Sequence, residues 1–276
     1  MNSSKKETYA VLADAGHHTA GKGLRGSGPA GAVSHPGAGP PHGVAKHARK
    51  SRRRFANCLE PLSRVEFFLS SRPRGELEFI QQGQAVEPHA GLRRDLKRLG
   101  AAAILAELAG EMASPPENLA AIFATLNMAL ERLEAGEPPE SLLPCFLLHL
   151  LRLGGYGLNL QTCRGCGREP DDGLTFHIPQ AALWCRVCRS QAPGPGVGIN
   201  PGAWKLLRLA QEMAADKLSR LRFQPLQLAQ SLTLLRRFVR HHVGRDLKSW
   251  SFWDKVGGDG PSGPAKQKLA TAGPGL

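Results

Sequence analysis

Four cysteines fall in two matched pairs. Cys163 and Cys166 form one C-x2-C pair, and Cys185 and Cys188 form a second, with 18 residues between the pairs. Two residues between cysteines let a tight turn direct both sulfurs to one point, and two such turns supply the four thiolates that tetrahedral Zn²⁺ accepts. A redox C-x-x-C motif or two disulfides would not explain two matched pairs at this spacing. We predict one structural zinc ion, because four protein ligands leave no position for water or substrate.

The surroundings of the two pairs suit this interpretation. Gly167 follows the first pair, where the backbone must bend, and 174–178 and 182–184 have the pattern of a hairpin that would bring the pairs together. A zinc ion with four thiolates is formally −2, and flanking arginines can offset that charge. These arginines are Arg164, Arg168, Arg186 and Arg189. Cys58 and Cys145 have no such partners, and Cys145 lies in an apolar run that predicts burial.

A second chemistry comes from two basic segments. Packing so many cations together is unfavourable unless anions relieve it, and nucleic-acid phosphates do so while releasing condensed counterions. Arginine also grips phosphate bidentately and stacks on bases. The alternative is a solvated surface, because basic runs are common. The predicted DNA-binding residues are Lys46, Arg49, Lys50, Arg52, Arg53 and Arg54 in the first segment, and Arg236, Arg237, Arg240, Arg245 and Lys248 in the second.

The net charge of +13 is concentrated at these two places. Residues 1–55 carry +8 and residues 201–256 carry +7, with a mildly acidic stretch between them. This distribution is typical of a protein with a polyanionic partner. A need for solubility, or attraction to a membrane surface, could produce the same distribution. We favour nucleic acid.

Other classes of protein find little support. No stretch approaches the ~20 apolar residues that span a bilayer, and 8–13 is too short for the core of a signal peptide. We therefore expect the cytoplasm, where thiols stay reduced and cysteines serve metal binding or burial. There is no phosphate loop, H-E-x-x-H or G-x-S-x-G motif, so we predict that the chain is not an enzyme.

The elements that must position these residues follow from periodicity. Residues 60–70 and 76–80 predict a β-hairpin. Beyond Pro88, apolar residues at spacings of three and four, including Leu92, Leu96 and Leu99 in the first stripe, predict three antiparallel helices with proline-marked connections. Helical patterns resume after the cysteines. We predict an α+β fold in which 1–87 form a β domain, 88–256 a helical domain interrupted by the zinc module 163–188, and 13–41 and 257–276 are disordered.

Several motifs together resemble the RecO family of bacterial DNA-repair proteins over about residues 43–256. Their order and spacing carry the resemblance, because each motif alone is weak. The motifs are Gly43–Lys46, Ala48–Phe55, Leu59–Pro61, Glu87–Pro88, Leu92–Leu96, Gly155–Tyr156 and His241–Ser249.

The resemblance implies an N-terminal OB-fold, a helical domain and a zinc module inserted into that domain. It also implies binding of single- and double-stranded DNA, annealing of complementary strands, and help to RecR in loading RecA on strands coated by single-strand binding protein, within the RecF pathway. The expected location is the bacterial cytoplasm, at the nucleoid, with no membrane or small-molecule partner. Residues 13–41 depart from the family pattern and would leave the OB-fold incomplete.

Two other functions remain open at this stage. The chain could be a zinc-stabilised adaptor that binds mainly proteins of a repair complex, with its basic regions serving solubility. It could also be a metal-dependent enzyme acting on nucleic acid, but the filled coordination shell and the lack of acid–base groups disfavour this. Strong salt dependence of DNA binding would distinguish the first hypothesis from the adaptor.

Overall fold

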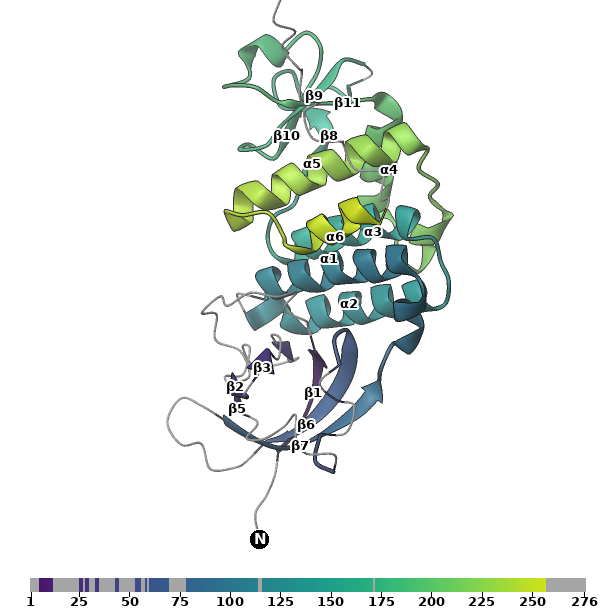
Figure 1. Cartoon of the computed structure of the whole chain (residues 1–276). Coiled ribbons are helices and arrows are strands. Elements are labelled where there is room, and N and C mark those ends of the chain that lie inside the picture. The colour runs from purple at the N-terminus through teal and green to yellow at the C-terminus, as the bar shows by residue number, and fades with distance from the viewer. Residues whose placement is uncertain are drawn as a thin grey trace, which may run out of the picture.

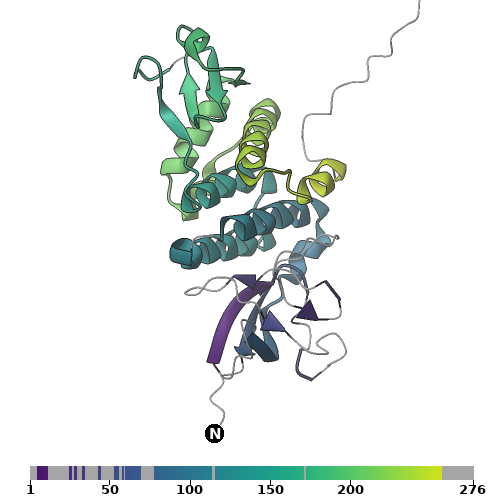
Figure 2. The same cartoon turned by 90° about the vertical axis from the view of Figure 1, so that its left-hand side faces the viewer.

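The chain forms a mixed α+β structure with small sheets at either end of stacked helices (Figure 1; Figure 2). The computed structural model describes residues 5–11, 25–26, 28–29, 33–34, 43–44, 53–55, 58, 60–69, 78–113, 116–170 and 172–256. Among these residues, no helix combines the length and the apolar character needed to cross a membrane.

The N-terminal sheet has five strands in the order β4-β1-β6-β7-β5. Strands β6 (Ser63–Leu69) and β7 (Glu78–Glu87) are antiparallel, which confirms the predicted hairpin, although β7 continues further along the chain than the pattern suggested. β1 (Lys5–Val11) pairs antiparallel with β6. Val65 and Phe67 of β6 are fully buried, as the alternation predicts.

Short strands complete this end of the chain. β4 (Val33–Ser34) pairs with β1, β5 (Gly43–Val44) runs parallel to β7, and β2 (Arg25–Gly26) pairs with β3 (Gly28–Pro29). The other residues of 13–41, and the whole of 257–276, lie outside the described residues. The disorder predicted for these two segments therefore stays a prediction.

Helices α1 (Leu96–Met112), α2 (Leu119–Glu134) and α3 (Pro139–Leu153) form the predicted three-helix arrangement. Asp95 begins α1 by accepting hydrogen bonds from the backbone N–H groups of Lys97 and Arg98, at 2.9 and 3.1 Å. Leu96 was predicted to lie in the core, but it is 58% exposed. It occupies the first turn of α1 and points to solvent, although its neighbour Lys97 already contacts Glu140 of α3.

Three further helices surround this arrangement. α4 (Pro201–Glu212) and α5 (Pro225–Val243) match the later helical patterns, and both start with proline at the first helical position, where its missing N–H costs nothing. α6 (Ser249–Lys255) was not predicted, because seven residues are too few to show a period. Its Trp250 and Trp253 are buried, and α6 packs on α1.

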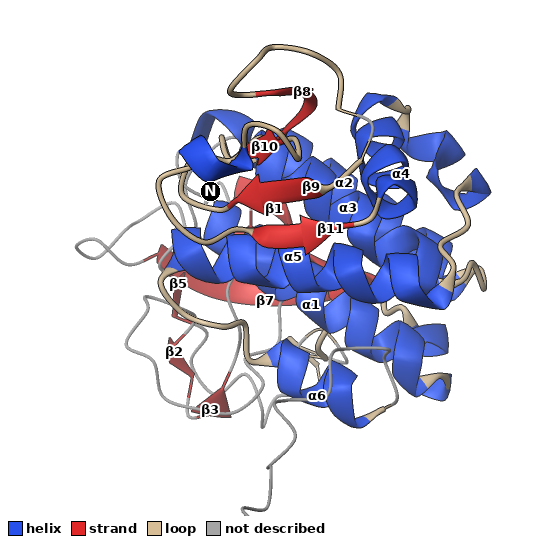
Figure 3. Cartoon of the chain, turned by 90° about the horizontal axis from the view of Figure 1, so that it is seen from above, coloured by secondary structure: helices blue, strands red, loops and turns tan. Residues whose placement is uncertain are grey.

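The cysteine-bearing segment folds as a second sheet of four strands in the order β11-β9-β10-β8. β9 (Leu174–His177) and β10 (Ala182–Trp184) form the predicted hairpin, while β8 (Asn159–Cys163) and β11 (Val197–Ile199) were not predicted. Seen from above, this sheet lies over α5 (Figure 3). Most of its buried apolar residues, such as Leu160, Phe176 and Leu183, belong to the same apolar core as the helices, whereas Cys163 and Trp184 form a small cluster of their own. The indole N–H of Trp204 in α4 donates to the Leu160 carbonyl of β8 at 2.7 Å, which ties the sheet to the helices.

Mainly polar contacts join the N-terminal sheet to the helices. The His89 Nδ1 lies 2.7 Å from Glu134 Oε2, and the Gly91 N–H donates to Glu134 Oε1 at 2.7 Å. Arg64 of β6 lies 3.7 Å from Glu131 of α2, and it also pairs at 3.5 Å with Glu87 of the neighbouring strand β7, within the sheet. His89, Glu87 and Glu134 are close enough to share a metal ion, but these hydrogen bonds and ion pairs account for their arrangement without one.

Glu107 of α1 holds the C-terminal helix in place. Its carboxylate accepts hydrogen bonds from the backbone N–H groups of Lys248 and Ser249, and from the Ser249 hydroxyl, at 2.8–3.0 Å. Arg245 donates to it at 3.0 Å. Burial works against the charged carboxylate, but these hydrogen bonds outweigh burial and lower the pKa of Glu107. One carboxylate thus stabilises the start of α6 against α1.

Replacing Glu107 by Ala is expected to destabilise the protein by about 3 kcal/mol, because it leaves buried donors and Arg245 without their acceptor. The midpoint of urea unfolding measures the effect. Glu117→Ala, which removes an exposed carboxylate, is the control and should change stability little. Equal unfolding midpoints for the two variants would contradict the role given to Glu107.

The same carboxylate predicts a pH dependence. A group whose folded pKa is lowered stabilises the fold above its unfolded pKa and loses that contribution as pH falls through the folded value. The stability difference between the wild type and Glu107→Gln should therefore be largest near neutral pH and shrink below about pH 4.5. Urea titrations at a series of pH values measure it, and a difference that grows on acidification would refute the assignment.

Candidate metal centre and basic surfaces

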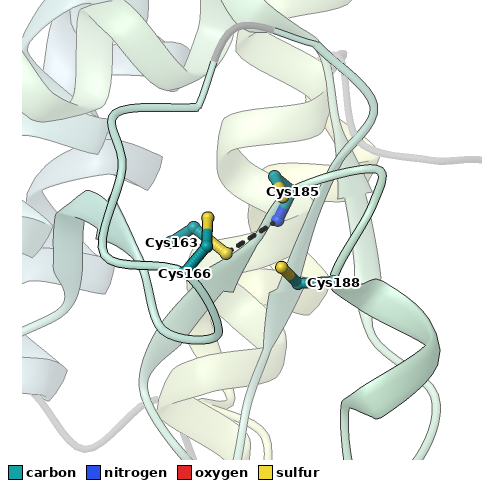
Figure 4. A group of neighbouring side chains, drawn as sticks. All are labelled: Cys163, Cys166, Cys185 and Cys188. Atoms are coloured by element: carbon teal, nitrogen blue, oxygen red, sulfur yellow. Dashed lines mark hydrogen bonds between the residues drawn. The ribbon is translucent and has the colours of Figure 1, made fainter.

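The four paired cysteines converge in the second sheet (Figure 4). The Sγ atoms of Cys163, Cys166, Cys185 and Cys188 all lie within 4.8 Å of one another. The Cys185 N–H donates to Cys163 Sγ at 3.3 Å, drawn as the dashed line. Cys163 and Cys188 are buried, whereas Cys166 is exposed. The structure thus brings together the four ligands predicted from spacing.

Each pair sits on a similar turn. The Gly167 N–H donates to the Cys163 carbonyl at 2.8 Å, and the Arg189 N–H donates to the Cys185 carbonyl at 2.9 Å. Gly167 has φ +71°, the left-handed backbone that glycine adopts readily, so the predicted bend is confirmed. At Gly165 a Cβ atom would lie 2.7 Å from the Cys188 Cβ, so a side chain there would force the two turns apart.

Two thiols of the cluster, those of Cys163 and Cys188, have pKa values shifted in opposite directions. Burial raises the pKa of Cys163, but hydrogen bonds from the backbone N–H groups of Cys185, Cys166 and Gly165 outweigh burial and lower it to about 6. The pKa of Cys188 rises to about 12, first through its hydrogen bond with Cys185 and then through burial. One thiolate in the cluster therefore opposes the formation of another, and a bound cation would relieve that opposition.

The donor set fits a metal ion. Zn–S bonds of about 2.3 Å in a tetrahedron place sulfurs about 3.8 Å apart, which is compatible with the separations here. The nearby carboxylate of Asp172 pairs with Arg186 at 3.8 Å and is not needed as a ligand. The four flanking arginines are exposed beside the two turns. The cluster can hold a metal ion with all four positions supplied by the chain.

The other two cysteines are separate from this cluster. Cys145 is completely buried in α3, and burial raises the pKa of its thiol to about 12. Cys58 is also buried, and its pKa rises to about 11 for the same reason. Both are therefore inert thiols, as predicted for Cys145.

The first basic segment is described only in part. Arg53 and Arg54 are exposed, and the Arg54 carbonyl accepts a hydrogen bond from the Gly83 N–H of β7 at 2.8 Å. This contact attaches the segment to the N-terminal sheet. The remaining predicted DNA-binding residues of this segment lie outside the described residues. They are Lys46, Arg49, Lys50 and Arg52.

Two arginines of the second basic segment have partners within the protein. Arg236 lies 3.1 Å from Asp246 and 2.9 Å from Asp254, and its guanidinium lies 5.4 Å from the ring centroid of Trp250. Arg245 pairs with Glu107 and Glu111. Acids distant in sequence therefore supply counter-charges to Arg236 within the protein. A phosphate would have to compete with those carboxylates at either arginine.

Arg237 and Arg240 are placed differently. Both lie on the exposed face of α5, and no ion pair or side-chain hydrogen bond engages them within the described part of the chain. α5 contains no acidic residue, and neither does the whole stretch 217–245. Lys248 is half-buried, with its backbone N–H on Glu107. The cationic surface of this end therefore centres on Arg237 and Arg240.

Comparison with known proteins bears on both the cysteine cluster and the basic surfaces. A family model described as "Recombination protein O C terminal" matches residues 93–251, and one described as "Recombination protein O N terminal" matches residues 37–89. The chain belongs to the RecO family. The C-terminal match covers more than half of the chain and includes all four cysteines of the cluster and the whole of α5.

Individual RecO proteins align over most of their length. The chain is 31% identical over 216 residues to "DNA repair protein RecO" of Syntrophus aciditrophicus, covering 77% of this chain and 83% of that protein. It is 32% identical over 219 residues to the protein of the same name from Anaeromyxobacter sp. strain Fw109-5, covering 78% and 84%. The N-terminal RecO match begins only at residue 37, so it leaves out most of the segment 13–41 that departs from the family pattern.

Tyr156, within the region matched by the RecO C-terminal model, had no predicted role. Tyr156 formed part of a motif in the sequence, but nothing in its spacing showed that its ring would pack against the His242 ring, at 4.7 Å between centroids with the planes tilted by 42°. The pairing joins residues 86 positions apart, and no local pattern reports such a distance.

We expect this RecO protein, purified under reducing conditions, to carry one metal ion per chain, measured by elemental analysis. Cys166→Ser should lower the metal content and the thermal midpoint together, because binding free energy at such a site is also folding free energy. Cys145→Ala is the matched control and should keep the metal. Full metal content in Cys166→Ser would argue against the four-sulfur site.

Proposed function

We propose that the protein is a DNA-binding mediator of DNA repair. The observation that carries the proposal is the exposed, acid-free face of α5, where Arg237 and Arg240 have no internal anion among the described residues. Paired guanidinium groups on such a face suit the phosphates of a nucleic-acid backbone. The related proteins named for DNA repair support the same role.

Two positively charged regions on one protein would suit the annealing of complementary strands. Arg53 and Arg54 belong to the N-terminal sheet, while Arg237 and Arg240 lie on α5, beyond the layer of α1 and α2 (Figure 1). Each place would neutralise one strand, which reduces the repulsion between two polyanions. In this proposal Lys46, Arg49, Lys50, Arg52 and Lys248 contribute further phosphate contacts, and Arg236 and Arg245 mainly position α6.

The metal in this proposal is a structural zinc ion. It would be held by Cys163, Cys166, Cys185 and Cys188, and it would fix the two turns that the small apolar cluster beside them cannot stabilise alone. With no coordination position left open, and no acid–base pair in the basic surfaces, the protein would act by binding and not as an enzyme. We place it in the cytoplasm, at the bacterial nucleoid.

The domain organisation follows the same hypothesis. We infer that the N-terminal sheet within 1–87 is an OB-fold, that 88–256 form the helical domain, and that 163–188 are its inserted zinc module. The expected partners are single- and double-stranded DNA, RecR and single-strand binding protein. With these partners the protein would help RecR to load RecA in the RecF pathway.

A second candidate is a zinc-stabilised adaptor that binds mainly proteins. The internal ion pairs of Arg236 and Arg245 favour it, because they remove two of the cations that would otherwise attract DNA. An adaptor should bind DNA weakly, with little dependence on the length of the strand. It should still form stable complexes with repair proteins.

The salt dependence of DNA binding tests the leading proposal. With about six phosphate contacts on single-stranded DNA, log K should fall with a slope of about −4 in log salt. Replacing Arg237 and Arg240 by Ala should reduce the slope by about 1.4, since each lost contact contributes about 0.7. Fluorescence anisotropy with a labelled oligonucleotide measures it, and replacing Arg52, Arg53 and Arg54 by Ala should flatten the slope further.

A matched control removes the same charge elsewhere. Arg94→Ala with Lys255→Ala takes away two exposed cations outside α5 and should leave the slope near the wild-type value. Equal slopes for the two double variants would favour the adaptor. Strand annealing, with and without single-strand binding protein, then distinguishes a mediator from a protein that merely binds DNA.

A further inference from the structure

Tyr156 occupies a fixed position at the end of α3. The Gly155 N–H donates to the Arg152 carbonyl at 3.1 Å, and the Tyr156 N–H donates to the Leu151 carbonyl at 2.8 Å. Gly155 has φ +87°. These two hydrogen bonds and the left-handed glycine form a Schellman motif, which sets the direction in which the chain leaves a helix. The backbone of Tyr156 is therefore held by the helix end.

The ring of Tyr156 is supported from one side. It lies 4.7 Å from the His242 ring, which lies 4.4 Å from Phe238, and Phe238 meets Phe176 of β9 edge-on at 6.0 Å, all between centroids. Phe238 and Phe176 are fully buried. The Tyr156 ring is thus the outermost member of an aromatic cluster whose inner members, Phe238 and Phe176, lie in the core.

The other side of the ring is open. Tyr156 is 36% exposed, and no hydrogen bond engages its hydroxyl within the described residues. A Cβ atom built on Gly155 or Gly157, its two chain neighbours, would meet nothing within 4 Å. The same holds for Gly244, which ends α5 two residues after His242. Part of the Tyr156 ring is therefore accessible to a ligand.

The charges near this ring suit a nucleic acid. His242 is uncharged at neutral pH, because burial, and secondarily the neighbouring His241, lower its pKa. His241 is exposed on the same turn, and Arg237 and Arg240 follow on the exposed face of α5. Arg237 and Arg240 lie about 140° and 160° around the helix from His242. A strand would therefore pass around the C-terminal end of α5 to contact both the arginines and the Tyr156 ring.

We propose that the exposed ring of Tyr156 is a stacking platform for a nucleobase of single-stranded DNA. His242 and Phe238 back the platform, and Arg237 and Arg240, on another face of α5, would hold phosphates elsewhere along the same strand. Stacking on one aromatic ring accepts any base, so the site would favour unpaired strands without reading their sequence. This inference rests on the proposed function, and it adds a contact that charge alone does not provide.

Fluorescence anisotropy with the full chain and labelled oligo(dT) tests the platform. An abasic oligomer of equal length, which has the phosphates but no bases, serves as the second probe. Tyr156→Phe keeps the ring and should bind oligo(dT) like the wild type. Tyr156→Leu keeps an apolar contact at the helix end but removes the aromatic face, and it should lose about tenfold in affinity for oligo(dT). Every variant should bind the abasic oligomer equally.

Other outcomes overturn the inference. A Tyr156→Leu protein that binds oligo(dT) as tightly as the wild type would leave Tyr156 with only its capping role. An equal loss on both oligomers would mean that the ring positions the arginines and touches no base. Should the wild type itself fail to bind oligo(dT), the DNA-binding function fails and the platform with it. If the wild type binds oligo(dT) and replacement of Tyr156 does not change that affinity, only the stacking platform is refuted and the DNA-binding function stands.

Discussion

The structure depends on bringing four cysteine sulfurs within 4.8 Å of one another. The buried apolar side chains around the two turns are few, and two of the three residues in their cluster are themselves ligands, Cys163 and Cys188, with Trp184 as the third. Such a cluster cannot offset the entropy of ordering two loops. A divalent ion held by the four sulfurs would gather the loops instead, while the strands beneath them rely on the apolar core they share with the helices. In this proposal the metal would stabilise the two turns, and the helical core stabilises the strands below them.

Much of this arrangement could be predicted from local pattern. Spacing indicated the four ligands, and alternation or helical periodicity indicated the β6–β7 and β9–β10 hairpins and the long helices. These features depend on residues close in sequence. Leu96 was misplaced because periodicity does not show which side chains in the first turn of a helix point to solvent. α6 is too short to repeat a pattern, and β8 and β11 are strands of three to five residues that owe their existence to partners elsewhere in the chain.

The basic residues show even more clearly that a local sequence pattern does not reveal contacts between distant parts of the chain. A run of arginines indicates positive charge, but the sequence does not tell which guanidinium has an internal partner. Arg236 and Arg237 are adjacent in α5, yet one is paired with Asp246 and Asp254 while the other is exposed. The difference arises because successive helical residues point about 100° apart. Only the position of α6 decides which of the two meets a carboxylate. Tyr156 was overlooked for a related reason, since its supporting rings come from α5 and β9.

The junction between the N-terminal sheet and the helices has a mechanical consequence. The ion pair between Arg64 of the sheet and Glu131 of α2 joins half-exposed side chains, and water can replace it at little cost. The helices and the cysteine-bearing sheet, in contrast, are joined through a continuous apolar interior that water cannot enter cheaply. Bending of the molecule is therefore expected to concentrate at one hinge, near His89. The sheet would then reorient relative to the helices, while the helices and the cysteine-bearing sheet, which share one apolar core, would move together.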